Sequence, residues 1–391
     1  MKVTDASTLV NSLYSQMTGQ TDIATVDDSN IVDIGKKLNQ IGSTEKIYNA
    51  ICDRIGKLIV KNKLFRGKFI DLMKDGWEFG NILQTLRVRS IEATSDPSYS
   101  PVNGQNYDQD TYKGRDIVQK FFTDYDNFQL DYWKPTDQLW TAFSSMDEMT
   151  RFLTGVEISI TNSLNKRIQG LAKTAIGNFI AHIVNKEDTG SAYSTLKAVN
   201  LLKLYNDAHA SATLTVANCR ESESFLRFAS KTMNNTYDRL EDMSVLFNLD
   251  GEDDVFSNPE DIKVVLLSTF ANDVKYHLYN AAGQFDYSLM QLPGYDTVPY
   301  WQASGDDYSE DTIGKIDITI KDEDAQGGTT TVQFGGIMGI MFDKRAVAIN
   351  CERRKVTSHY NADIDQFHIY DKYMGQYIND FSENFVVFYI A

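Results

Sequence analysis

The chain has 391 residues, of which 42% are hydrophobic and 24% are charged, and its formal net charge is −16. These are globular proportions and exclude a disordered or fibrous chain. The acidic balance disfavours a protein that reads DNA sequence, because such proteins carry a basic surface. The 21 Phe, 21 Tyr and 4 Trp residues supply large, rigid contact area, which suits interfaces as well as cores.

Three cysteines, Cys52, Cys219 and Cys351, lie far apart and form no CxxC pair. Neither a zinc site nor a disulfide framework is therefore expected. The first residues lack the apolar core of a signal peptide, and no apolar run reaches the roughly 18 residues of a membrane span. We expect an intracellular, soluble product with no cofactor and no membrane partner.

The N-terminal part of the chain predicts an arm followed by a helix and a strand. Residues 1–45 are polar and weakly periodic, and residues 18–30 predict a flexible segment. In residues 44–55 an isoleucine recurs at every fourth position, which predicts a helix. Residues 57–65 (KLIVKNKLF) are apolar and β-branched, which favours a strand.

A basic segment overlaps this region. Residues 54–68 contain no acidic residue and six basic ones: Arg54, Lys57, Lys61, Lys63, Arg66 and Lys68. Such a charge run can be the solvated face of a strand. On an acidic chain it can also be a surface that contacts acidic groups of a partner.

Residues 80–134 predict a projecting hairpin. Apolar and polar residues alternate in residues 81–90 and again in residues 128–132, which predicts two strands that each have one covered face. Between them lie residues 92–114, rich in Pro, Gly, Asn, Ser and Tyr. A connection this long is uncommon unless it has a function. We expect the two strands to pair as an extended arm.

The strongest signal is a long helix over residues 145–186. Ser145 and Glu148 form a capping box, which marks a helix start. From Met149 to Ile183, apolar residues recur in steps of three or four and define one stripe. A helix of this length would extend roughly 60 Å, which exceeds the diameter of a small domain.

The rest of the chain predicts a mixture of helices and strands. The expected elements are helices at 195–209, 221–240 and 271–280, a strand at 263–268, an acidic loop at 248–262, a hairpin at 315–334, a strand region at 336–354 and a final strand at 384–391. The glycines of FGGIMGIM lack GxGxxG spacing, so they predict a tight bend before a strand.

The sequence carries no recognisable catalytic or metal-binding constellation. It contains no GxSxG, GxxxxGK[ST] or HExxH motif, and its five histidines share no metal-ligand spacing. His182 on the long helix is expected to be a packing or polar-face residue. The acid pairs Asp253/Asp254 and Asp306/Asp307 can coordinate a cation or be plain surface. We expect no enzymatic activity, no bound metal and a protein built for contact.

Two segments resemble a known family. They are residues 53–88, which include DRIGKLIVKNKLF and FRGKFIDLMKDGWEFGNILQTLRV, and residues 341–388, which begin MFDKRAVAINCERR and end NFVVF. Together with the long helix they resemble the major capsid protein of tailed bacteriophages, which has the Hong Kong 97-type fold. The likeness is greatest to the coat proteins of small short-tailed phages of the phi-29-like, Picovirinae-type group.

The resemblance implies an α+β fold with an extended β-hairpin loop and a long spine helix. The implied regions are an N-terminal arm (1–45), a peripheral domain (46–60, 141–190 and 341–391) that includes the spine helix 145–186, an extended loop (61–140) and an axial domain (191–340).

The resemblance also implies function and partners. The protein would self-assemble through pentamers and hexamers into the icosahedral or prolate head shell of a tailed phage, around double-stranded DNA held without sequence specificity. A separate scaffolding protein and a portal are implied, as are assembly in the host cytoplasm and a final location in the virion. Lys113 lies in the extended loop, but no cross-linking partner is evident, so assembly is expected to be noncovalent.

Contacts between subunits are expected from two sets of residues. The candidates are Lys57, Lys61, Lys63, Arg66 and Lys68 of the basic segment and Tyr99, Tyr107 and Tyr112 of the loop. An encapsulin-like nanocompartment shell is the alternative function. A further alternative is a phage tail or adhesion component, which trimeric β-repeats would support. An unrecognised hydrolase is another, which turnover of a substrate would support.

Overall fold

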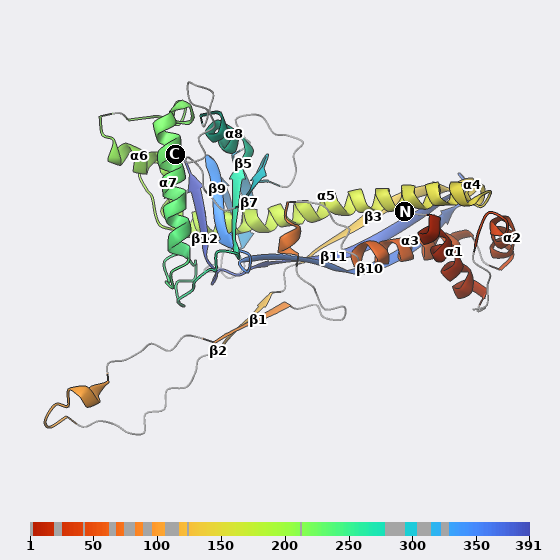
Figure 1. Ribbon diagram of the computed structural model, residues 1–391, viewed down its shortest axis with the longest axis horizontal. Coiled ribbons are helices and arrows are strands. Elements are labelled where there is room, and N and C mark those ends of the chain that lie inside the picture. The colour runs from red at the N-terminus through yellow and green to blue at the C-terminus, as the bar shows by residue number, and fades with distance from the viewer. Residues whose placement is uncertain are drawn as a thin grey trace. The chain divides into compact units, whose positions relative to one another are not determined.

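The computed structural model describes residues 3–18, 26–41, 44–61, 68–73, 83–88, 96–105, 117–122, 125–211, 213–277, 294–302, 314–321 and 328–391. Figure 1 shows a mixture of helices and strands. The helices are α1 (Val3–Thr18), α2 (Ile31–Ile41), α3 (Thr44–Lys61), α4 (Thr136–Ala142), α5 (Met146–Lys186), α6 (Leu201–Ala208), α7 (Glu223–Leu240) and α8 (Ser268–His277), with short 3₁₀ turns η1 (Ile70–Leu72), η2 (Pro97–Tyr99) and η3 (Cys219–Glu221).

The strands within the described residues form four sheets. They are β1 (Leu83–Val88), β2 (Ile117–Phe122), β3 (Tyr125–Pro135), β4 (Ala198–Asn200), β5 (Ile262–Leu267), β6 (Tyr295–Val298), β7 (Ile316–Lys321), β8 (Thr329–Phe334), β9 (Ile337–Asp343), β10 (Val347–Asn361), β11 (Gln366–Asn379) and β12 (Phe385–Tyr389). The strand orders are β1-β2, β10-β11-β3, β4-β12-β9-β5-β6 and β7-β8.

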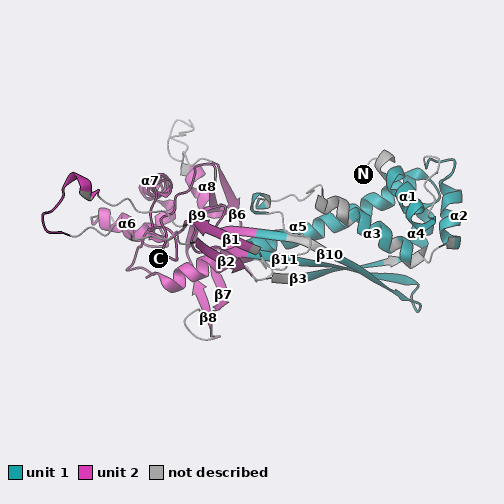
Figure 2. Ribbon diagram, turned by 90° about the horizontal axis from the view of Figure 1, so that it is seen from below, with its two compact units in different colours: residues 1–79, 124–172, 349–377 teal, residues 80–123, 173–348, 378–391 magenta. Residues whose placement is uncertain are grey.

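The chain divides into two compact units (Figure 2). Unit 1 comprises residues 1–79, 124–172 and 349–377, and unit 2 comprises residues 80–123, 173–348 and 378–391. Residues 349–377 belong to unit 1, and residues 341–348 and 378–391 belong to unit 2. The reason is that β9 and β12 pair in the five-stranded sheet, while β11 pairs with β3.

The N-terminal helices of unit 1 pack on one another. Helix α1 contacts both α2 and α3, and the buried side chains are Ala6, Val10, Leu13, Ile31, Ile34, Leu38, Ile47, Ile51 and Ile55. The weak periodicity of residues 1–45 predicted no helix, but the structure has helices at 3–18 and 31–41. One apolar residue per helical turn is enough to bury a face, although the overall composition stays polar. Most of the expected flexible segment, residues 19–25, lies outside the described residues.

Helix α3 confirms the predicted helix at 44–55 and continues to Lys61. The strand expected from residue 57 is wrong for 57–61, and residues 62–65 lie outside the described part of the chain. Leu58 and Ile59 follow Ile55 by three and four positions, so this short apolar run also has helical spacing. Runs of this kind do not distinguish a strand from a helix.

Helix α5 confirms the long helix. The backbone N–H of Glu148 donates to Ser145 Oγ at 3.2 Å, as the capping box predicts. The stripe is buried from Met149 to Ile183, with Leu153 rather than Phe152 facing the core. Its 41 residues correspond to roughly 60 Å. The division between the units falls within this helix, after Ala172.

The sheet of unit 1 places an aromatic strand beside β11. Strand β3 confirms the strand predicted at 128–132, and it pairs antiparallel with β11 along its whole length. The Phe128 and Tyr373 rings stack, with centroids 5.3 Å apart. Asp371 is fully buried and accepts hydrogen bonds from Tyr132 Oη at 3.0 Å and from Tyr373 Oη at 2.8 Å.

The projecting hairpin exists, but its second strand differs from the expected one. Strand β1 pairs antiparallel with β2, from Leu83 opposite Phe122 to Val88 opposite Ile117. The predicted pairing of 81–90 with 128–132 is wrong: β1 pairs with β2, and β3 pairs with β11 in another sheet. The second strand of the hairpin is therefore β2, the strand that precedes the predicted one, β3.

The five-stranded sheet forms the core of unit 2. Every residue of β5, β9 and β12 is buried, which requires cover on both faces of the sheet. Helix α8 contacts β5 and β6, and α6 contacts β12. The strands predicted at 263–268, 336–354 and 384–391 are confirmed, as is the β7–β8 hairpin within 315–334. Helices α6, α7 and α8 lie at the three predicted positions, with shifted ends.

The predicted bend at FGGIMGIM is confirmed at Gly336. This residue has φ +74° immediately before β9 and accepts a backbone hydrogen bond from Ile390 at 2.9 Å. A Cβ atom at Gly336 would lie 2.1 Å from the Ile390 carbonyl oxygen. Only glycine allows this approach together with a positive φ.

Candidate functional site

The β1–β2 hairpin of unit 2 has one face on which four apolar side chains are exposed. Leu86 is 63% exposed, Val88 51%, Ile117 60% and Phe121 58%. These side chains share a face because strand residues alternate and because Val88 lies opposite Ile117. Large apolar side chains gathered on an exposed face are typical of a surface that contacts another protein.

The opposite face of the hairpin carries cations that bind the body of unit 2. Arg87 on β1 forms an ion pair with Glu383, and its second guanidinium nitrogen donates to the Ser382 carbonyl at 3.1 Å. Lys120 on β2 forms an ion pair with Asp250 and lies 3.4 Å from Asp380. We call these two side chains and their acidic partners the hairpin anchor.

The acidic side of the hairpin anchor is held by the segment just before β12. Asp380 accepts hydrogen bonds from the backbone N–H of Ser382 at 3.1 Å and from its hydroxyl at 2.6 Å. The Phe381 carbonyl accepts from the backbone N–H groups of Leu249 and Asp250 at 2.9 and 3.1 Å. Both acidic groups that face Lys120 are therefore fixed to the same short segment.

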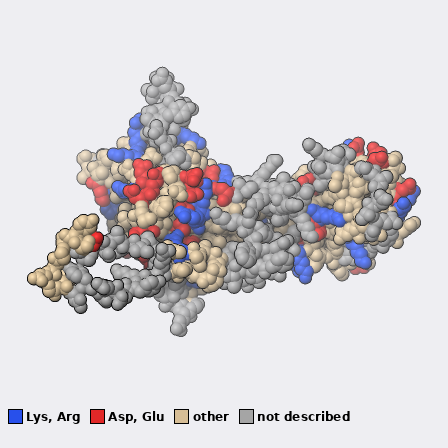
Figure 3. Space-filling view, turned by 60° about the horizontal axis from the view of Figure 1, so that its bottom comes forward, with Lys and Arg blue, Asp and Glu red and all other residues tan. Residues whose placement is uncertain are grey.

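Burial and nearby cations set the electrostatics beside the anchor. Burial raises the pKa of Glu383, although Arg87 and Arg345 act against this shift. Burial would also raise the pKa of Asp343, but hydrogen bonds from Arg345 outweigh it, so that this pKa lies below its ordinary value. Arg345 binds Asp343 with two nitrogens, at 3.0 and 2.8 Å. Figure 3 shows Lys and Arg beside Asp and Glu on the surface of unit 2.

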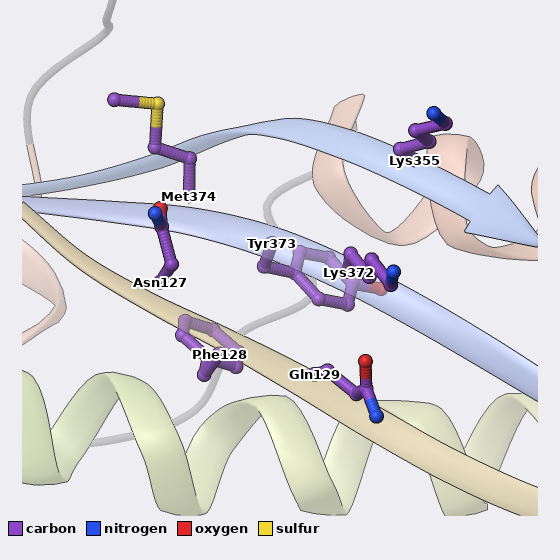
Figure 4. A pocket seen from close by; sticks show the side chains of 7 residues that line it. All are labelled: Asn127, Phe128, Gln129, Lys355, Lys372, Tyr373 and Met374. Atoms are coloured by element: carbon purple, nitrogen blue, oxygen red, sulfur yellow. The ribbon is translucent and has the colours of Figure 1, made fainter.

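Unit 1 has an open pocket of about 460 Å³ along its sheet (Figure 4). Its walls combine polar and apolar side chains from β3, β10 and β11: Asn127, Phe128, Gln129, Lys355, Lys372, Tyr373 and Met374. Arg167 of α5 lies over the Phe128 ring, 5.3 Å from its centroid. Two lysine side chains line the pocket. Its lining residues contain no pair that could act as acid and base or as nucleophile and base.

The described residues contain no group of three or more His, Cys, Asp or Glu that could hold a metal ion. Cys219 is buried, and burial raises the pKa of its thiol to about 11, so the thiol is protonated at neutral pH. His182 packs its ring 4.6 Å from Phe381, as expected of a packing residue. Asp306 and Asp307 lie outside the described residues. Within the described part of the chain, no helix is long and apolar enough to cross a membrane.

The structure describes only some of the contact residues that the sequence predicted. Tyr99 in η2 is 87% exposed, and Lys68 is exposed. Lys57 and Lys61 lie on α3, where their side chains are not described. The remaining candidates, which lie outside the described residues, are Lys63, Arg66, Tyr107 and Tyr112.

Arg54, at the start of the basic segment, is bound within its own chain. Its guanidinium donates to Gln16 Oε1 at 2.8 Å and also contacts Ser12. It therefore ties α3 to α1 in unit 1.

Sequence reasoning missed the apolar hairpin face and the hairpin anchor. Alternation in β1 identified the strand but not which face would be covered. Leu86 and Val88 alternate with Arg87, and the usual interpretation places the apolar side inward. The structure has the reverse arrangement, because Arg87 and Lys120 face acidic groups of their own chain.

These features define a structural subunit whose exposed surfaces are suited to contact with other chains. A family model described as "Phi29-like phage major capsid protein" matches residues 8–389, so the chain belongs to that family. No curated protein matches the sequence.

Three solved phage structures contain chains that are similar to this one. A chain in the capsid structure of Staphylococcus phage Andhra is 12% identical, with 84% of this chain and 85% of that chain covered and a TM-score of 0.47. A chain in the structure of the head fiber and inner core protein of bacteriophage P68 gives the same four values. A chain in the procapsid of satellite phage P4 is 11% identical over 86% and 90%, with a TM-score of 0.40.

The structure confirms the expected α+β mixture of helices and strands, and family membership confirms the expected role as a head shell protein of a phage. It favours this role over the encapsulin-like alternative. The protein is a structural component of the virion that works as one of many subunits.

Proposed function

We propose that each subunit of this phage shell lays its β1–β2 hairpin across a neighbouring copy of the same chain. The observation that carries the proposal is the exposed apolar face made by Leu86, Val88, Ile117 and Phe121. Burying apolar surface stabilises a contact by about 25 cal/mol per Å². A head shell requires many copies in contact, and this face exposes four apolar side chains in the described part of unit 2.

The proposed contact is one of several that act together. Obligate interfaces bury about 2,000–5,000 Å², which is more than one hairpin face supplies. Several weak contacts per subunit give a stable shell through avidity, while each single contact stays weak enough for errors to be corrected. Tyr99, Tyr107 and Tyr112 extend the same contact along the loop.

The domain roles follow the family pattern. In this proposal α5 is the spine helix of a peripheral domain (46–60, 141–190 and 341–391), and residues 191–340 form an axial domain around five- and six-fold axes. Residues 61–140 are the extended loop. Residues 1–45 act as an N-terminal arm, and their helical content does not conflict with that role.

The partners also follow the family pattern. Subunits form pentamers and hexamers of an icosahedral or prolate head, in the host cytoplasm, with a separate scaffolding protein and a portal. Assembly is noncovalent, and the protein has no enzymatic activity. The net charge of −16 supports an acidic inner wall along which double-stranded DNA moves without adhering. Tight, salt-sensitive DNA binding by purified subunits would contradict this part of the proposal.

The basic segment offers a second contact. Lys57, Lys61, Lys63, Arg66 and Lys68 are proposed to meet the acidic surface of an adjoining subunit. Because exposed charges are screened at high ionic strength, added salt should slow early assembly. Assembly rates that do not change between low and high salt, followed by light scattering, would contradict this contact.

The hairpin contact is tested by comparing two serine variants. Phe121→Ser removes a large apolar side chain from the proposed contact face, whereas Gln119→Ser changes a neighbouring polar position on the same face. Burying a Phe side chain is worth about 1.5–3 kcal/mol, so Phe121→Ser should raise the subunit concentration needed for assembly by about tenfold or more. Gln119→Ser should raise it much less. Equal assembly of both variants, judged by negative-stain microscopy and sedimentation, would refute the proposal.

A further inference from the structure

The β1–β2 hairpin is too small to hold a fixed direction by itself. Each strand has six residues, and among the described residues these two strands pair only with each other. An isolated two-stranded hairpin is marginally stable in water. Its orientation therefore depends on side-chain contacts with the body of unit 2.

The hairpin anchor supplies one such contact on each strand. Arg87 lies on β1 and Lys120 on β2, and the register places Arg87 opposite Val118 and Lys120 opposite Thr85. The two cations therefore lie diagonally on the same face. A single contact would allow the hairpin to swivel, whereas two contacts on different strands oppose both rotation and sliding.

The acidic partners cannot easily follow a moving hairpin. Asp380 and Glu383 are 5% and 4% exposed, and they lie in the segment before β12, an interior strand of the five-stranded sheet. The Asp380 N–H donates to the Ala346 carbonyl at 2.8 Å, and the Glu383 N–H donates to the Asp380 carbonyl at 3.1 Å. The cations thus bind a rigid edge of the protein core.

The geometry of the hairpin amplifies small errors at this base. The two strands have six residues each and extend roughly 20 Å, so a swing of about 15° at one end would displace the other end by about 5 Å. Such a displacement exceeds the spacing of neighbouring strands, which is about 4.8 Å. The contact with a neighbouring subunit would then lose its register.

We propose that Arg87 and Lys120 are positioning residues that set the direction of the hairpin before a neighbour binds. They act through their own chain and do not contact the neighbour. The inference rests on the proposed contact between the hairpin and a neighbouring copy. It adds that the free subunit already holds the hairpin ready for this contact, which lowers the cost of ordering it during assembly.

The test uses full-length subunits with the anchor weakened. Lys120→Ala removes one contact, and Arg87→Ala with Glu383→Gln removes the other without leaving a buried, unpaired carboxylate. The matched control is Arg227→Ala on α7, which breaks an exposed ion pair with Glu223 in the same unit. Urea unfolding establishes that all variants remain folded, and Lys120→Arg tests rescue by a retained positive charge.

Two measurements decide the outcome. In unassembled subunits, amide hydrogen exchange of β1 and β2 should speed up by about tenfold in the anchor variants and stay unchanged in Arg227→Ala. Assembly should slow by a similar factor, and Lys120→Arg should restore most of both properties. Unchanged hydrogen exchange would overturn the inference, as would faster exchange without slower assembly. The hairpin contact itself is tested separately by Phe121→Ser, so the two proposals can fail independently.

Discussion

The five-stranded sheet and the β1–β2 hairpin belong to the same unit but use apolar residues in opposite ways. In β5, β9 and β12 every side chain is buried within the chain. In the hairpin four large apolar residues are exposed on one face, and the other face combines the cations Arg87 and Lys120 with half-buried apolar residues of β2. The sheet completes its contacts inside one subunit, whereas the hairpin leaves them for a second one. Substitutions in the sheet should therefore affect folding, and substitutions on the hairpin should affect assembly.

The largest effect is expected at the centre of the sheet. Phe385 is fully buried and stacks on Phe179 at 4.2 Å and on Phe342 at 5.1 Å between ring centroids. Phe385→Ala should lower the free energy of unfolding by about 3–5 kcal/mol. Urea denaturation followed by circular dichroism measures this loss. Phe256→Ala, at a residue that is 44% exposed, is the control and should lower the free energy of unfolding far less. Equal losses in the two variants would contradict the distinction between buried and exposed positions.

The bend that leads into β9 should tolerate no side chain. Gly336→Ala combines a positive φ with a Cβ atom 2.1 Å from a backbone oxygen, and we expect a cost of about 2–4 kcal/mol. Gly251→Ala is the matched control, because Gly251 has φ +69° but open space around its Cβ position. Thermal unfolding of the two variants separates backbone strain from steric overlap. A Gly251→Ala loss as large as that of Gly336→Ala would mean that the close approach to Ile390 is unimportant.

The ion pair between buried Asp343 at the end of β9 and half-exposed Arg345 should make the stability of the protein depend on pH. The pKa of Asp343 is lower in the folded chain than its ordinary value of 3.8, so the unfolded chain binds more protons in acid. The stabilisation is therefore complete above about pH 5 and is lost as the pH falls through the folded pKa. Asp343→Asn should cost about 1.5–3 kcal/mol at neutral pH and should flatten this acid dependence.

Urea midpoints between pH 7 and pH 3 provide the measurement for Asp343. The exposed acid Asp254 offers a control, since Asp254→Asn should leave the wild-type pH profile nearly intact. A profile for Asp343→Asn as steep as that of the wild type would show that another group carries the acid sensitivity.

The smallest effect on folding is expected on the hairpin. Because Phe121 is 58% exposed, Phe121→Ala should change the free energy of unfolding of the isolated subunit by less than about 1 kcal/mol. The same variant should assemble poorly. A loss of several kcal/mol in the isolated subunit would mean that the hairpin face is part of the subunit core, contrary to the comparison above.

The sequence predicted elements well wherever a periodic pattern was long. Helix α5 was found because its apolar stripe continues for about ten turns and begins with a capping box at Ser145. Strands β5 and β12 were found because short apolar runs end at turn signals. The short helices α1 and α2 were missed, since one buried residue per turn, such as Val10 or Leu38, hardly changes a polar composition.

The candidate site was predicted only as a region. The alternation in β1 and the long polar connection indicated a projecting hairpin, but not that β2 would be its second strand. The hairpin anchor joins Arg87 to Glu383 and Lys120 to Asp250, pairs separated by 296 and 130 positions. No local pattern encodes contacts so distant in the chain, because they exist only once the sheet has brought residues 380–383 to the hairpin.

The most direct test of the central claim is an electron cryomicroscopy map of the assembled shell, at a resolution that shows side chains. The account predicts that Leu86, Val88, Ile117 and Phe121 of each subunit are covered by a neighbouring copy of the chain. A map in which this face is open to solvent, or is covered by the same subunit, would contradict it.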